Sequence, residues 1–184
     1  MTRLWDLPQN AGACAAALAR VRTRQVAVDV GAHAGIWTRA LATEFSIVHA
    51  FEPSPPTFRW LQECIDGQPI VAFDASTSEP IRKHWPPLLN VRTHDVALAD
   101  RPCVGRMTRR VGRPNTTFGK FVTLPGMESV GEAIEGEDQI PVTTLDLALA
   151  DDCGPVGLLK IDVEGAEALV LCGAVQTLRR DVPV

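Results

Sequence analysis

A short turn between two glycines is the first feature that could contact a ligand. Gly31 and Gly35 enclose Ala32-His33-Ala34 directly after an apolar run, Val26–Val30. Glycine has no Cβ, so the backbone of such a turn can approach a bound molecule closely. The spacing is GxxxG, so the GxGxxG pattern of dinucleotide-binding turns is absent. A tight strand-to-helix turn also needs glycine for structural reasons, and the turn alone does not separate the two readings.

Glu52 lies 21 positions after Gly31, at the end of the next apolar run. A carboxylate at the end of a second parallel strand can accept hydrogen bonds from both hydroxyl groups of a ribose. The structural alternative is an exposed acid before the turn at Pro53. The glycine turn and Glu52 together predict a ligand that contains adenosine, either a nicotinamide dinucleotide or S-adenosylmethionine. The missing middle glycine favours S-adenosylmethionine, which has no pyrophosphate for that glycine to admit.

A second set of ionisable residues lies late in the chain, at Lys160, Asp162, Glu164 and Glu167. Methyl transfer is a displacement at an activated sulfonium, so the protein mainly positions the acceptor and removes its proton. Asp162 is the first candidate for the general base or for orienting the acceptor, Glu164 is the second, and Glu167 lies one helical turn later. These acids could instead stabilise a helix N-terminus. Their spacing is not diagnostic of a metal site, and we expect none.

Apolar periodicity places these residues at the carboxyl ends of predicted strands. Short apolar runs predict strands at 26–30, 46–51, 91–98 and 157–163, and a shorter one at 140–145. Helical spacing predicts helices at 10–24, 36–45, 56–65 and 166–180, the last broken near Gly173, and a helical turn through Leu149. The alternation predicts a doubly wound α/β fold with a mainly parallel sheet, whose ligands bind beyond the carboxyl ends of the strands. Asp95, in the second half of the third predicted strand, joins the candidate site.

Two segments interrupt this alternation. Residues 66–90 contain four prolines and predict a possible insertion. Residues 101–138 predict a hairpin or excursion over one end of the sheet, on the substrate side. In this segment a basic run at 101–127 precedes an acidic run at 128–138. The basic run could steer an anionic acceptor such as a phosphorylated or nucleotide-linked sugar, although such runs usually form a solvated surface.

Four blocks in this order resemble the motifs of FkbM-type S-adenosylmethionine-dependent methyltransferases. They are Val28–Gly35, Ala50–Pro55, Val142–Asp146, and Leu159–Glu167 followed by Leu171–Ala174. The resemblance extends from about Gln25 to Pro183. It implies a Rossmann-like class I methyltransferase fold and an enzyme that uses S-adenosyl-L-methionine. The implied reaction is O-methylation of a hydroxyl on a sugar or small natural product.

The resemblance also implies roles for individual residues. Asp29, Gly31 and Gly35 would surround the methionine part and the sulfonium, Glu52 would hold the ribose, and Asp95 would bind the adenine amino group. His33 belongs to the same cofactor-binding set, but the family usually has asparagine at this position. His33 could act as an acid or base near the sulfonium, or simply bond to solvent or backbone. Lys160, Asp162, Glu164 and Glu167 form the implied catalytic set.

Composition limits the other classes of function. The 184 residues are 46% hydrophobic and 22% charged, which fits one domain with a genuine core. The net charge of −4 argues against a nucleic-acid partner. The longest apolar stretch, Ala11–Ala19, is too short to span a membrane and makes a poor signal peptide, so we expect a cytoplasmic protein without a membrane partner. Five widely spaced cysteines are expected to be free thiols.

The predicted single domain, 1–184, divides into a leading helix (1–24), a cofactor-binding βαβ unit (25–65), the two interrupting segments, and a final strand and helix (156–184). A class I methyltransferase sheet has seven strands, whereas four parallel strands can be assigned here. The sheet therefore looks short at its C-terminal end, and its fourth strand could be an open edge. We expect either a fragment of a longer protein or completion by the basic hairpin or by a second chain, as in a homodimer through the open edge.

Two other functions remain open from the sequence. One is a nicotinamide-dependent oxidoreductase, against which the absent GxGxxG argues. The other is a degenerate or partial methyltransferase domain that binds the cofactor or a partner without turnover.

Overall fold

The computed structural model describes most of the chain in several stretches. These are residues 11–68, 70–73, 80–83, 85–110, 120–123, 134–151, 154–181 and 183–184.

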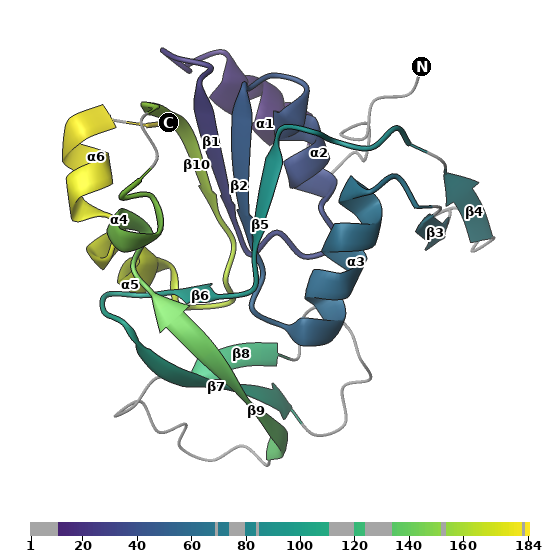
Figure 1. The fold of residues 1–184 in the computed structure, drawn as a ribbon, viewed down its shortest axis with the longest axis vertical. Coiled ribbons are helices and arrows are strands. Elements are labelled where there is room, and N and C mark those ends of the chain that lie inside the picture. Colours follow the sequence, from purple (N-terminus) through teal and green to yellow (C-terminus); the bar gives the residue numbers. More distant parts are fainter. Residues whose placement is uncertain are drawn as a thin grey trace.

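A four-stranded parallel sheet forms the centre of the molecule (Figure 1). Its order is β10 (Val156–Ile161), β1 (Val26–Val30), β2 (Ile47–Phe51) and β5 (Val91–His94). Each neighbouring pair is parallel, so all four carboxyl ends lie at the same edge. Every residue of β1 is buried, as expected for an apolar strand covered on both faces. The predicted α/β fold with a mainly parallel sheet is therefore confirmed.

Helices cover both faces of this sheet (Figure 1). The elements α1 (Ala11–Leu18), α2 (Ile36–Ala42) and α3 (Pro55–Ile65) lie on one face, and α4 (Leu145–Ala148), α5 (Glu167–Cys172) and α6 (Val175–Asp181) lie on the other. Alternation along β1 divides its side chains between two cores. Ala27 packs with Leu41 under the first group, and Val28 packs with Val170 under the second. The β1 strand therefore anchors both halves of the fold.

A second sheet lies beyond the carboxyl ends of the parallel strands (Figure 1). Its order is β6 (Ala97–Leu98), β9 (Ile134–Thr143), β7 (Cys103–Arg110) and β8 (Lys120–Thr123). β7 pairs antiparallel with both β8 and β9, whereas β6 and β9 are parallel. Buried Met107 and Ile140 attach this sheet to the rest of the domain through a core that Leu169 of α5 also contacts. The described strands of the predicted excursion therefore lie over one end of the parallel sheet, whereas residues 111–119 and 124–133 lie outside the described residues.

The predicted strand at 91–98 is wrong as a single element. The chain leaves the parallel sheet after His94, and Ala97–Leu98 pair with Val142 and Thr143 of β9 instead of with β2. One apolar run therefore contributes a strand to each of two sheets. The periodicity of the run could not show this division. The predicted short strand at 140–145 is the end of the ten-residue β9.

The proline-containing segment 66–90 contains two short strands that the sequence did not predict. β3 (Ile70–Phe73) and β4 (Pro80–Lys83) form a separate antiparallel pair. Figure 1 shows this pair at the side of the molecule, away from the carboxyl ends of the parallel strands. These two strands therefore form a sheet of their own and are not part of the central sheet.

Helix boundaries differ modestly from the predictions. α1 ends at Leu18 and not at Arg24, and its predicted N-cap, Asn10, lies outside the described residues. The predicted break at Gly173 is confirmed, because α5 ends at Cys172 and α6 begins at Val175. A Cβ at Gly173 would lie 1.9 Å from the carbonyl oxygen of Ala99, so a side chain there would force α5 away from the strand region.

Val184 makes two backbone hydrogen bonds to the outer edge of β10. The Val184 amide donates to the Gly157 carbonyl at 3.1 Å, and the Leu159 amide donates to the Val184 carbonyl at 3.0 Å. Cys14, Cys64, Cys103 and Cys172 are free thiols, and Cys153 lies outside the described residues. In the part of the chain that the structure describes, no helix has both the length and the apolar character needed to cross a membrane.

Candidate functional site

The glycine turn connects β1 to α2 at the carboxyl edge of the parallel sheet. Gly31 and Gly35 have φ angles of 74° and 82°, in the left-handed region that glycine adopts without strain. A Cβ at Gly31 would lie 2.0 Å from the backbone oxygen of Asp162, and one at Gly35 would lie 2.9 Å from Leu61. Both glycines are therefore required by backbone conformation and by packing. Backbone conformation and packing are sufficient to explain both glycines, whether or not a ligand is bound.

His33, within the same turn, also has a positive φ of 51°. Among residues with a side chain, asparagine, aspartate and histidine occur most readily in this region. The conformation thus gives a physical reason why histidine can stand where the resembling family usually has asparagine. The imidazole lies edge-on to Trp60 of α3, with 6.2 Å between ring centroids, and Trp60 is 49% exposed.

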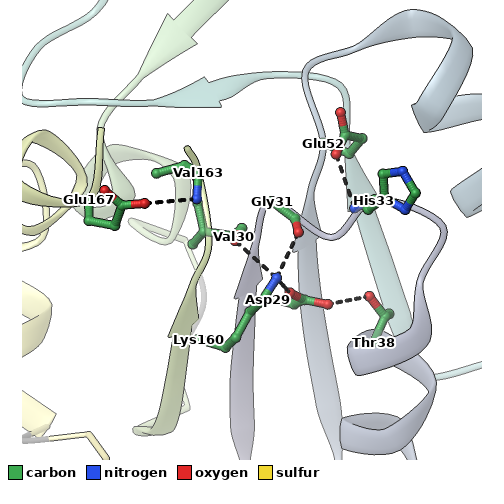
Figure 2. A network of polar contacts seen from close by, with 9 residues as sticks. All are labelled: Asp29, Val30, Gly31, His33, Thr38, Glu52, Lys160, Val163 and Glu167. Carbon is green, nitrogen blue, oxygen red and sulfur yellow. Dashed lines mark hydrogen bonds and ion pairs between the residues drawn. The ribbon is translucent and has the colours of Figure 1, made fainter. Parts of the chain in front are cut away.

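Glu52 lies directly after β2, and its carboxylate faces the glycine turn (Figure 2). One oxygen, Oε2, accepts a hydrogen bond from the His33 amide at 3.0 Å, and Oε1 accepts one from the Ser54 amide at 2.9 Å. The residue is only 7% exposed. The Gly31 and Ala32 amides both donate to the Phe51 carbonyl at 3.0 Å, so the turn and the end of β2 are joined by backbone as well.

Asp29 lies at the other side of the turn and is fully buried. Its Oδ2 accepts a hydrogen bond from the Thr38 hydroxyl at 2.7 Å, and its Oδ1 lies 2.9 Å from the Lys160 ammonium (Figure 2). This second contact is an ion pair without hydrogen-bond alignment, because Oδ1 accepts no hydrogen bond from the described residues. The Lys160 ammonium donates instead to the carbonyl oxygens of Gly31 at 2.7 Å and Val30 at 3.4 Å. Asp29 and Lys160 therefore meet beneath the turn, and Asp29 has no exposed surface to offer a ligand.

Asp162 and Glu164 follow β10 and are both exposed. The Asp162 amide donates to the Val30 carbonyl at 3.0 Å, which holds this segment beside the glycine turn. Glu164 has a φ of 56° and precedes Gly165, whose φ is 105°, so the chain reverses sharply here. The structure thus brings Asp162 to the same edge as Gly31 while leaving its side chain accessible.

Glu167 binds the backbone of this same reversal. Its Oε1 accepts hydrogen bonds from the Gly165 amide at 3.1 Å and the Val163 amide at 3.3 Å (Figure 2). Hydrogen bonds from its own amide, and then from those of Gly165 and Val163, lower the pKa of the Glu167 carboxyl below its ordinary value. The pattern resembles a capping interaction at the start of α5.

Asp95 is exposed and directly follows β5. The backbone places it next to Glu52, because the Glu52 amide donates to the His94 carbonyl at 3.0 Å. Beneath this edge, the rings of Phe51 and His94 stack with centroids 4.3 Å apart, and His49 Nδ1 lies 3.0 Å from His94 Nε2. Sequence reasoning missed these stacked rings, and it also missed Thr38 and Ser54. Alternation at a spacing of two along β2 could have placed His49 and Phe51 on one face.

All the predicted residues thus gather at one edge, but in different environments. Gly31, His33, Gly35, Glu52 and Asp95 line the ends of β1, β2 and β5, and Asp162 and Glu164 extend from β10. Asp29, Lys160 and Glu167 support the backbone around them. Within the described stretches, no group of three or more histidine, cysteine, aspartate or glutamate residues is placed to hold a metal ion. Such an edge can bind a polar ligand through Glu52 and can present carboxylates to a second molecule.

Comparisons with known proteins give the family. A model of the methyltransferase FkbM domain matches residues 29–184. The crystal structure of a methyltransferase FkbM from Methylobacillus flagellatus is similar, with 18% sequence identity and a TM-score of 0.49. That match covers 88% of this chain and 31% of the other, so this chain spans about a third of that protein's length. No curated protein matches significantly. The family match includes the glycine turn, Glu52 and the Lys160–Glu167 segment, and the chain therefore belongs to the FkbM methyltransferase family.

Proposed function

We propose that this protein transfers a methyl group from S-adenosyl-L-methionine to a hydroxyl group of a sugar or small natural product. The family assignment supports methyl transfer and favours it over a nicotinamide-dependent oxidation. The choice of donor and of acceptor depends on the arrangement at the carboxyl edge.

Glu52 is the observation that carries the choice of donor. A carboxylate has about four sites at which its two oxygens can accept hydrogen bonds. The His33 and Ser54 amides use one site on each oxygen and fix the orientation of the group. So oriented, the carboxylate would accept hydrogen bonds from the vicinal hydroxyls of a ribose. Asp95 follows His94, whose carbonyl accepts from the Glu52 amide, and it would bind the adenine amino group.

The glycine turn fits the other end of the same ligand. S-adenosylmethionine supplies an activated methyl group on a positively charged sulfur. The turn lies at the same edge as Glu52, and its His33 amide already orients that carboxylate. The Cβ positions of Gly31 and Gly35 face Asp162 and Leu61 of the protein, so the ligand would contact the backbone of the turn from another side. Asp29 would act on the ligand through the turn, since it is buried beneath it.

The acceptor would lie between the turn and the segment after β10. A hydroxyl group must lose its proton as the new C–O bond forms, and a positioned carboxylate can accept that proton. Asp162 is exposed and held beside Gly31, so we assign it this role, with Glu164 as the second candidate. We keep the prediction of a small or carbohydrate acceptor, without nucleic acid, metal or membrane. Free cysteines favour a reducing compartment such as the cytoplasm.

Replacement of Glu52 by glutamine tests the choice of donor. The variant keeps the size of the side chain but removes the charge and one accepting oxygen. Loss of charged hydrogen bonds to the ribose should weaken S-adenosylhomocysteine binding about 10- to 100-fold, measured by isothermal titration calorimetry. Glu63→Gln is the matched control, because Glu63 is exposed on α3 and outside the site. Equal dissociation constants for Glu52→Gln and wild type would remove Glu52 from the ribose site.

A further inference from the structure

A catalytic lysine would present its ammonium to the substrate, whereas the Lys160 ammonium contacts groups of the protein itself. It lies beneath the glycine turn, and its side chain is only 12% exposed. Its three contacts are the Asp29 carboxylate at 2.9 Å, the Gly31 carbonyl at 2.7 Å and the Val30 carbonyl at 3.4 Å. Of the three N–H donors of an ammonium group, two are used by the carbonyls, and the contact with Asp29 is an ion pair. These protein groups hold the ammonium beneath the turn.

The hydrogen bond from Lys160 to the Gly31 carbonyl holds the glycine turn on the side of β10. On the opposite side, the turn is bonded to β2 through the Gly31 and Ala32 amides, which donate to Phe51, and through the His33 amide, which donates to Glu52. On the β10 side, the bonds are those of Lys160 and of the Asp162 amide to Val30. The turn is therefore hydrogen-bonded on both sides, and among the described residues Lys160 is the side chain that bonds it to β10 (Figure 2).

We propose that Lys160 is a positioning residue, which fixes the peptide plane of Gly31 so that the turn and Glu52 keep the conformation that binds the methyl donor. This inference rests on the proposed function. Asp29 supports Lys160 in this role by neutralising its charge, and Thr38 holds the second oxygen of Asp29. In this proposal Asp29 and Lys160 stabilise the turn from beneath, whereas Asp162 and Glu164 contact the acceptor.

If Lys160 only compensated the charge of Asp29, its removal from a protein that already lacks this carboxylate would leave the glycine turn unchanged. Removing Lys160 alone would leave a buried carboxylate without its partner, and the fold itself would lose stability. The informative comparison is therefore Asp29→Asn against the double variant Asp29→Asn/Lys160→Met. Both lack the buried carboxylate, and they differ only in the ammonium that contacts the Gly31 carbonyl.

Hydrogen exchange measured by mass spectrometry reads the turn directly, without any ligand. In the double variant, the peptide that covers residues 29–36 should exchange about tenfold faster than in Asp29→Asn, because the turn opens more often. Peptides from β2 and α3 should exchange equally in both variants. Equal exchange at 29–36, or an equal increase along the whole chain, would overturn the proposal, the second outcome by showing a general structural role.

Calorimetric titration with S-adenosylhomocysteine completes the test. The dissociation constant of the double variant should be roughly tenfold higher than that of Asp29→Asn at the same temperature. Equal constants would overturn the positioning role even if exchange at the turn increased. Wild type that fails to bind S-adenosylhomocysteine would instead reject the proposed function, and the exchange comparison would still decide whether Lys160 fixes the turn.

Discussion

The acids of the candidate site divide into two groups by exposure and by hydrogen bonding. Asp29 and Glu167 are bonded to protein groups that they hold in place, whereas Asp162 and Glu164 are exposed. Sequence spacing predicted which carboxylates gather at the carboxyl edge. It could not predict which are accessible, because accessibility depends on the reversal at Glu164 and Gly165 and on the contact of Lys160 with the turn.

Asp162→Asn should separate catalysis from cofactor binding. The amide cannot accept a proton, so kcat should fall by roughly 10²- to 10⁴-fold, while the dissociation constant of S-adenosylhomocysteine should change little. Transfer of a radiolabelled methyl group to a panel of monosaccharides and nucleotide-linked sugars measures the rate.

Asp66→Asn provides the control for that experiment, because Asp66 is an exposed acid at the end of α3. Its rate should equal that of wild type. If Asp162→Asn retained full activity, the base would have to be another group. If wild type bound the cofactor but methylated no acceptor, the alternative of a domain that binds without turnover would be favoured.

Elements were predicted well where a single sheet or helix explains the periodicity of a segment. β1, the α2 helix and the break at Gly173 fall close to their predicted positions. The errors arise where one apolar run contributes to two sheets, as at 91–98, or where pairing partners are distant in sequence, as for β9. Local patterns cannot show such pairings, because the partner strand decides them.

Two residues of the segment Val142–Asp146 cap helices. This segment is one of the blocks on which the family resemblance rests. The Thr144 hydroxyl accepts from the Leu147 amide at 3.1 Å and caps α4. Asp146 caps α6 across the fold: its carboxylate accepts from the Gln176 and Thr177 amides, both at 2.8 Å, and from the Thr177 hydroxyl at 2.9 Å. A block shared with the family can therefore lie outside the chemistry.

Asp146→Ala should lower the free energy of unfolding without affecting the cofactor site. Removal of a cap costs about 0.5–2 kcal/mol, and three lost hydrogen bonds place this variant near the upper limit. Chemical denaturation measures the change, with Gln176→Ala, an exposed residue of the same helix, as the control. The assignment fails if Asp146→Ala is as stable as wild type, or if it weakens S-adenosylhomocysteine binding as much as Glu52→Gln does.

At the scale of the molecule, the parallel sheet has four strands within the described residues, the same number that the sequence predicted. Val184 pairs with Gly157 and Leu159 at the outer edge of β10, so this edge accepts at least one more residue in strand-like pairing. A homodimer through the edge stays a prediction from the sequence.

The antiparallel sheet contains residues of both charged runs. The register places Arg109 of β7 opposite Glu135 of β9, so basic and acidic runs occupy neighbouring strands. The steering of an anionic acceptor by the basic run stays a prediction from the sequence.

The central claim is that an adenosine-containing methyl donor binds at the ends of β1, β2 and β5. Titration of ¹⁵N-labelled wild type with S-adenosylhomocysteine, followed by ¹H–¹⁵N correlation spectra, tests both binding and location. We predict saturable shifts concentrated at the amides of Gly31, His33 and Asp95, with those of α6 unchanged. The absence of shifts at millimolar ligand, or shifts confined to residues away from this edge, would contradict the account.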